Sequence, residues 1–154
     1  MKLKDKQIFE KGNLKFAVIG HIEWINFLKV DILPKPGVIS HAKESIEFPA
    51  GGGTLIAKTL KELTHNEVYF FTSLGKDFYG EESFKKLSKM GLNLEVAWRK
   101  NQTRKGFSLT DNKGERAITV VGDRLQPRIN DNLNWDLLND VDGIIFGHWA
   151  AING

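Results

Sequence analysis

Nearly continuous apolar runs alternate with helical spacings along this chain. The run at residues 14–20 predicts a strand that is buried on both faces of a mostly parallel sheet. The run at residues 67–73 predicts a second buried strand, and the run at residues 141–146 predicts a third core strand. Apolar residues spaced three and four positions apart predict two amphipathic helices between these strands. We expect the first helix, after Gly53, to bury Leu55, Ile56, Thr59, Leu60 and Leu63, and the second, at residues 81–90, to bury Phe84, Leu87 and Met90.

Two segments interrupt this α/β alternation. Residues 21–48 and 94–121 are rich in β-branched and aromatic residues, with firm turns at residues 34–37 and 111–114. We expect the two segments to pair as a small separate sheet. Ligands of open α/β sheets bind at the carboxyl ends of the strands, so this sheet is predicted to be a lid that excludes water. The predicted fold is α/β, a doubly wound, Rossmann-like core with a small β lid.

Composition narrows the class of protein. The 154 residues are 41% hydrophobic and 27% charged, which is typical of a soluble globular chain of about one domain. The net charge is +3, and the lysines alternate with acidic residues, so we expect a solvated surface and no nucleic-acid partner. No cysteine is present, and the start lacks the apolar segment of a signal peptide. We therefore predict a cytoplasmic protein without a membrane partner.

A run of three glycines leads directly into the first predicted helix. Gly51, Gly52 and Gly53 allow backbone to approach a ligand closely, and a helix start offers unpaired N–H groups and a positive dipole end. We predict that these glycines bind a substrate through their backbone. A dinucleotide-binding Rossmann module is an alternative, but there the glycines follow a buried strand at once, whereas Gly20 opens no helix.

Four stretches in this order resemble the PfkB (ribokinase-like) family of carbohydrate kinases. The first strand and first lid strand of the family resemble Val18–Gly20 with Val30–Gly37, and its glycine-led helix start resembles Ala50–Ala57. Its G-x-D-x-x-G turn resembles Gly75–Gly80, and its second lid segment resembles Thr103-Arg104 with Asp111–Arg116. The resemblance implies ATP- and magnesium-dependent phosphoryl transfer to a sugar or nucleoside hydroxyl. It makes residues 1–154 similar to the N-terminal part of one ribokinase-like domain, with lid segments at about 21–48 and 94–121.

The residues at the expected substrate site depart from the family pattern. Glu23 and Ile25 stand where the family places Asn and Asp, and Leu55 stands where a further Asn is common, which argues against ribose itself. Glu23 is still a candidate to accept hydrogen bonds from hydroxyl groups. Arg104, on the second lid segment, is a candidate clamp for an anionic substrate, with a solvated lid arginine as the alternative.

Further candidates lie at the edge of this site. His148 follows the last predicted strand and is a candidate substrate contact, as is the neighbouring Trp149. His21 and Glu23 alternate on one strand, but two ligands are too few for a metal site, so we predict none. Asp77 is expected to cap the helix that follows it.

The family's catalytic G-A-G-D motif has no counterpart in these 154 residues, and neither does a P-loop. The resemblance places the catalytic Asp in a C-terminal half, so no catalytic residue is predicted here and the chain alone is not expected to turn over. We expect a truncated form of the fold whose sheet ends on an unpaired strand. Alternatives are a non-catalytic sugar-binding fragment and a nucleoside kinase of the same family. Homodimerisation through the lid is a further expectation.

Overall fold

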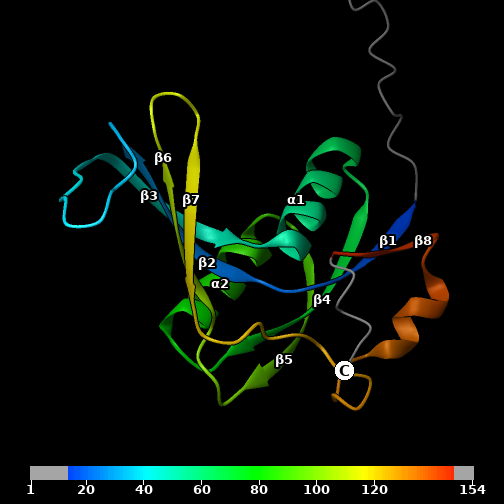
Figure 1. Cartoon of the computed structure of the whole chain (residues 1–154). Helices are drawn as coiled ribbons and strands as arrows, with labels where there is room; N and C mark the ends of the chain where they lie inside the picture. Colours follow the sequence, from blue (N-terminus) through cyan, green and yellow to red (C-terminus); the bar gives the residue numbers. More distant parts are fainter. Residues whose placement is uncertain (1–13, 148–154) are drawn as a thin grey trace, which may run out of the picture.

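The computed structural model describes residues 14–147, which form a parallel core sheet and a separate lid sheet (Figure 1). The core sheet is four-stranded in the order β5-β4-β1-β8, with every pair parallel. Its strands are β1 (Lys15–Ile19), β4 (Glu67–Gly75), β5 (Asn93–Arg99) and β8 (Gly143–Phe146). The helices are α1 (Gly52–Thr64), α2 (Phe78–Lys89) and a 3-10 helix, η1 (Trp135–Asp140). This arrangement confirms the predicted α/β fold with a mostly parallel sheet.

The lid sheet is also four-stranded, in the order β3-β2-β6-β7. Its strands are β2 (Glu23–Val30), β3 (Ala42–Ala50), β6 (Lys105–Thr110) and β7 (Arg116–Val121). Two antiparallel hairpins, β2–β3 and β6–β7, are joined by a parallel pairing of β2 with β6. In Figure 1, β3, β6 and β7 project away from the core, while β2 runs back toward β1. Residues 20–22 therefore connect the core strand β1 to the lid strand β2, and residues 100–104 connect β5 to β6.

The strand β5 corrects the predicted extent of the second lid segment. We expected residues 94–121 to lie in the lid, but β5 pairs with β4 in the core sheet from Tyr69↔Asn93 to Gly75↔Arg99. The physical reason is the intervening helix α2, because two strands joined by a helical crossover pair in parallel within one sheet. The lid strands of this segment are β6 and β7 alone, starting at Lys105.

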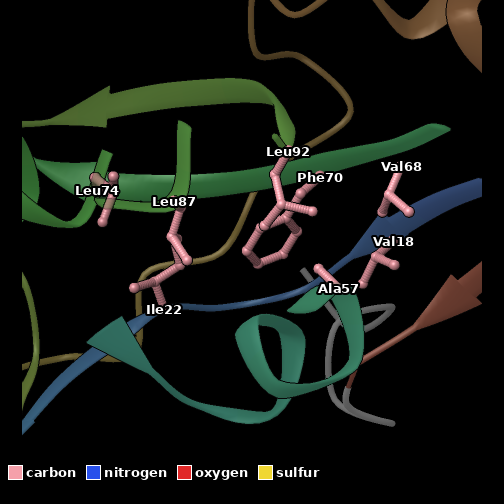
Figure 2. Close-up of a cluster of buried hydrophobic side chains, with 8 residues drawn as sticks. All are labelled: Val18, Ile22, Ala57, Val68, Phe70, Leu74, Leu87 and Leu92. Carbon is pink, nitrogen blue, oxygen red and sulfur yellow. The ribbon is translucent and has the colours of Figure 1, made fainter. Parts of the chain in front are cut away.

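Both faces of the central strands are buried, as their apolar runs predicted. On one face, side chains from β1, β4, α1 and α2, and from the residues directly before β2 and β5, converge in a single cluster, shown in Figure 2: Val18, Ile22, Ala57, Val68, Phe70, Leu74, Leu87 and Leu92. On the opposite face, Ala17, Ile19 and Phe71 pack against η1 and its flanking residues. Phe71 stacks on Trp135 with ring centroids 5.1 Å apart. Successive strand residues thus serve opposite faces of the sheet.

The helices bury different faces from those predicted. In α1, Leu55 is 66% exposed, Leu63 is 70% exposed and Thr59 is also exposed, while Gly53, Thr54 and Ala57 are buried. Ile56 and Leu60 pack at the edge of the core, as expected. The sheet lies so close to the helix that small residues fit the contact better than large ones. The prediction assumed that the large apolar side chains of α1 face the core, and it therefore chose the wrong buried face of this helix.

The same correction applies to α2. Its buried residues are Gly80, Ser83 and Leu87, whereas Phe84 is 39% exposed and contacts the ring of Trp98 instead of the core. Leu87 was predicted correctly, and Met90 packs partly against the core. The predicted cap is confirmed, because the Asp77 carboxylate accepts a hydrogen bond from the Gly80 N–H at 2.8 Å. The helix begins three residues earlier than its apolar spacing indicated.

The strand β8 is the edge of the core sheet as described over residues 14–147, which agrees with the expected unpaired final strand. Ile144 and Phe146 are 44% and 49% exposed. No helix within these residues is long and apolar enough to cross a membrane.

Leucine truncations distinguish the observed helix faces from the predicted ones. Leu87→Ala should lower the free energy of unfolding by about 2–5 kcal/mol, because the side chain is fully buried. Leu63→Ala, on the exposed face of α1, should change it by about 0.5 kcal/mol or less. Urea unfolding followed by circular dichroism measures both values. Equal losses for the two variants would contradict the assignment.

Candidate functional site

Three backbone segments meet at the carboxyl edge of the core sheet, and glycine is required where they touch. A Cβ at Gly20, just after β1, would lie 2.7 Å from the Cα of Gly53. A Cβ at Gly147, just after β8, would lie 2.6 Å from the same atom. No real side chain tolerates such distances, so the ends of two strands are pressed against the start of α1. We call Gly20, Gly53 and Gly147 the glycine junction.

The preceding glycines complete the turn into α1. Gly51 has a φ of 95°, a conformation that favours glycine, and its Cβ would lie 3.1 Å from the His21 carbonyl oxygen and 3.2 Å from the Glu23 nitrogen. A Cβ at Gly52 would meet the Gly147 carbonyl oxygen at 2.5 Å. Within residues 14–147, no side chain caps the helix, and its first turn holds no acidic residue. A helix start of this kind can offer N–H groups to a polar ligand, and the predicted binding role of the glycines stays a prediction.

A buried charge cluster lies beside this turn. Glu23 opens β2 and is 8% exposed, and His21 is 4% exposed. The Glu23 Oε1 lies 3.4 Å from the His21 Nε2 and 3.3 Å from the Arg104 Nε, so one carboxylate oxygen faces two basic groups. The Arg104 Nε is buried and lacks a partner with hydrogen-bond geometry in the part of the chain that the structure describes. The Arg104 guanidinium therefore balances the charge of Glu23, while its Nε–H group donates no hydrogen bond within residues 14–147.

The cluster keeps Glu23 ionised. Hydrogen bonding to His21 lowers the pKa of the Glu23 carboxyl below its ordinary value of 4.5, and the charges of Arg104 and Arg124 act in the same direction against the effect of burial. A carboxylate held in this state is a strong hydrogen-bond acceptor. It is chemically suited to bind hydroxyl groups.

Arg104 reaches this position through the pairing of the two lid hairpins. Its carbonyl accepts a hydrogen bond from the Trp24 N–H at 2.9 Å, next to the parallel pairing of β2 with β6. We call the place where β2 and β6 begin to pair, at Trp24 and Lys105, the lid root. There the ring of Trp24 packs against Tyr79 of α2, with ring centroids 5.6 Å apart. Two residues distant in sequence, Glu23 and Arg104, are brought together by this contact between strands.

The predicted site residues divide into two groups. Glu23, Arg104 and the glycines at 51–53 converge at one place, although their roles in binding remain predictions. His148 and Trp149 lie outside the described residues. The sequence analysis considered His21 only as a metal ligand and did not predict that it would be the charge partner of Glu23. The two residues stand two positions apart, which places their side chains on the same side of a strand, and this spacing could have indicated the contact. Within residues 14–147, no three His, Asp or Glu side chains gather as metal ligands.

A parallel core sheet with a β lid at the carboxyl ends of its strands defines a ribokinase-like fold. The family model "pfkB family carbohydrate kinase" matches residues 13–148, so the chain belongs to this family of kinases.

Solved structures agree with the family assignment. A protein from Agrobacterium tumefaciens that is provisionally described as a ribokinase is 18% identical, with a TM-score of 0.76 over 88% of this chain and 44% of that one. Ribokinase from Thermotoga maritima is 25% identical, with a TM-score of 0.68 over 85% of this chain and 44% of that one. The chain thus spans less than half the length of these structures. Among curated proteins, no sequence matches it significantly.

The glycine junction predicts that a glycine-to-alanine substitution inside a helix, which usually stabilises a protein, will destabilise this one. Gly53→Ala should lower the free energy of unfolding by about 1–3 kcal/mol, because the new Cβ would lie 2.8 Å from the Gly20 carbonyl carbon. Alanine inside a helix ordinarily stabilises by about 0.5–1 kcal/mol relative to glycine. Ser88→Ala, at an exposed position of α2, is the control and should change stability by about 0.5 kcal/mol or less. A Gly53→Ala variant that gains stability in urea unfolding would refute the junction.

The charge cluster predicts a pH dependence of stability. The pKa of Glu23 is lower in the folded chain than in the unfolded one, so its stabilising contribution is complete above about pH 4.5 and is lost as the pH falls through the folded-state pKa. Arg104→Gln should raise the Glu23 pKa, measured by ¹³C NMR of the carboxyl carbon. The stability difference between this variant and the wild type should shrink below pH 4.5. Lys113→Gln, in the exposed lid turn, should leave the Glu23 titration unchanged.

Proposed function

We propose that the full-length protein transfers the γ-phosphoryl group of ATP to a hydroxyl of a sugar or related acceptor. This chain supplies the acceptor-binding half and the lid. One observation carries the proposal: in a chain of the pfkB family, the Glu23 cluster and the uncapped start of α1 lie together at the carboxyl edge of the core sheet. That edge is the usual ligand position in open α/β folds.

Each group has a distinct part in the proposed binding. The ionised Glu23 carboxylate accepts hydrogen bonds from acceptor hydroxyls, and the N–H groups at Gly52 and Gly53 donate to acceptor oxygens. Arg104 holds Glu23 in charge balance and places a donor at the root of the lid. Phosphoryl transfer depends chiefly on orienting the acceptor and excluding water, which is the contribution proposed for this half. We assign no general base within residues 1–154.

The nucleotide and metal belong to the proposal for the full-length protein. Similar structures include Arabidopsis thaliana ribokinase complexed with ribose and ATP, 21% identical with a TM-score of 0.57 over 72% of this chain, and a Cryptococcus neoformans ribokinase in complex with ADP. They support ATP as the donor, and we propose Mg²⁺ as the ion that accompanies it in phosphoryl transfer. Within residues 14–147, no three His, Asp or Glu side chains form a metal-binding group.

A nucleoside acceptor is the alternative within the family. Nucleoside kinase from Methanocaldococcus jannaschii has a TM-score of 0.57 and 19% identity over 70% of this chain. Glu23 and Ile25 at the start of β2 favour an acceptor other than ribose under either alternative. A non-catalytic sugar-binding role is the second alternative, and it applies to this chain without a catalytic half.

We also propose that the lid pairs with the lid of a second copy. On one face of its sheet, Ile46, Phe27 and Ile118 share a cross-strand row with the buried Ser108, and Val120 lies two residues further along β7 on the same face. Ile46, Ile118 and Val120 are 62%, 51% and 39% exposed. An apolar face of this kind is typical of a protein–protein contact. Sedimentation of Ile118→Asp beside the wild type tests it, since only the wild type should dimerise.

We propose the cytoplasm as the compartment, which suits a cysteine-free, ATP-dependent enzyme.

The decisive test starts from the coding sequence beyond Gly154. We expect an in-frame continuation with a G-A-G-D motif, and ATP-dependent ADP release by its product in a screen of sugars and nucleosides. Glu23→Gln and Arg104→Gln should each lower kcat/KM on the order of tenfold to a hundredfold, because each leaves a buried charge without its partner. Lys113→Gln is the control. A stop codon directly after Gly154 would exclude the kinase and leave the binding role.

A further inference from the structure

The G-x-D-x-x-G turn at residues 75–80 makes contacts that capping a helix does not require. One carboxylate oxygen of Asp77, Oδ1, accepts the Gly80 N–H at 2.8 Å and caps α2. The other, Oδ2, accepts the Thr103 N–H at 2.7 Å. The two oxygens thus join the start of α2 to the residue that precedes Arg104.

The glycines of this turn form a socket for Thr103. Thr103 is 2% exposed, and its Oγ1 accepts the Gly75 N–H at 3.0 Å. A Cβ at Gly75 would lie 2.5 Å from the Thr103 nitrogen, and a Cβ at Gly80 would lie 2.9 Å from the Thr103 Oγ1. Side chains at either glycine would displace Thr103. A Cβ at Gly80 would also collide with the Gly75 carbonyl oxygen, so the two glycines both let the turn close on itself and leave room for Thr103.

Thr103 directly precedes Arg104, which is the last residue before the lid strand β6. The Arg104 carbonyl accepts the Trp24 N–H, and the Arg104 Nε lies 3.3 Å from Glu23. A path of direct contacts therefore leads from Asp77 through Thr103 and Arg104 to Glu23. A second contact supports the same geometry, because Tyr79 of α2 packs against Trp24 and lies under the Lys105 ammonium at 4.9 Å from its ring centroid.

We propose that Asp77 is a positioning residue: by holding Thr103, it fixes Arg104 against Glu23 at the root of the lid. Both of its carboxylate oxygens are engaged by backbone N–H groups, which suits an anchor rather than a group that contacts substrate. The description of Arg104 and Glu23 as an acceptor site rests on the proposed function. The positioning of Arg104 by Asp77 depends only on contacts within this chain.

Two substitutions separate the anchor from the helix cap. Asp77→Asn keeps a carbonyl oxygen to cap α2, but its amide nitrogen cannot accept the Thr103 N–H. Asp77→Ser is also a good cap, and its shorter side chain offers one oxygen instead of two. Thr103→Val removes the acceptor for the Gly75 N–H, and Thr103→Ser restores it. Asp111→Asn is the matched control, because the Asp111 Oδ1 accepts the Lys113 and Glu115 N–H groups in the lid turn, away from Arg104.

The readouts are the titration of Glu23 and the exchange of single amides in the 154-residue chain. His21, Arg104 and Arg124 are the charged groups that act on Glu23, and only Arg104 adjoins the anchor. Asp77→Asn, Asp77→Ser and Thr103→Val should each raise the Glu23 pKa in ¹³C NMR, in the direction given by Arg104→Gln. The exchange of the Trp24 amide should accelerate about tenfold or more, since one hydrogen bond at the lid root is weakened. Thr103→Ser and Asp111→Asn should match the wild type.

A double variant gives the sharpest result. If Asp77 acts through Arg104, Asp77→Asn should raise the Glu23 pKa no further once Arg104 is glutamine. Full additivity, or an unchanged Glu23 pKa in the Asp77 variants while the α2 amides lose protection, would overturn the proposal and leave Asp77 as a helix cap. None of these measurements needs a substrate. Failure to find kinase activity would remove the acceptor role but leave the anchor intact.

Discussion

The close backbone contact of Gly20, Gly53 and Gly147 is the constraint on which the rest of this structure depends. It presses the ends of β1 and β8 against the start of α1, which leaves no room for a side chain. The same contact fixes where the chain leaves the core for the lid, because Gly20 is followed at once by residues that lead into β2. Close packing of backbone at a strand edge thus determines the position of a polar site.

The charge cluster beside this junction adds little stability compared with an apolar replacement of the whole cluster, although removing one of its partners is destabilising. Burying a carboxylate and two basic groups costs desolvation that their attraction only partly returns. Apolar residues would serve a purely structural role at least as well. Under the proposed function, the cluster keeps Glu23 as an ionised carboxylate that accepts hydrogen bonds from the acceptor, with Arg104 and His21 beside the same oxygen. Its geometry in turn depends on how the lid root is attached to α2.

Most of the fold was predictable because strands and helices leave local signals. The apolar runs at β1, β4 and β8 and the hairpin turn at residues 111–114 were all correctly interpreted. The errors occurred where packing depends on closeness and not on hydrophobicity. Gly53, Ala57 and Ser83 are buried because a sheet approaches them, whereas Leu55 and Leu63 are exposed. The strand β5 was misplaced because its composition resembles that of a lid strand, and its pairing with β4 is settled by the α2 crossover.

The sequence alone determined the elements, their order, the family resemblance and the residue types at the site, because these are properties of local pattern and motif. It also indicated that Glu23 and the glycine run belong to one region, through their place after β1 and before α1. Only the tertiary structure decided that His21 and Arg104 share one oxygen of Glu23, and that Asp77 holds Thr103. These contacts join residues distant in sequence, and their distances depend on how two sheets and a helix start pack together, which no local pattern records.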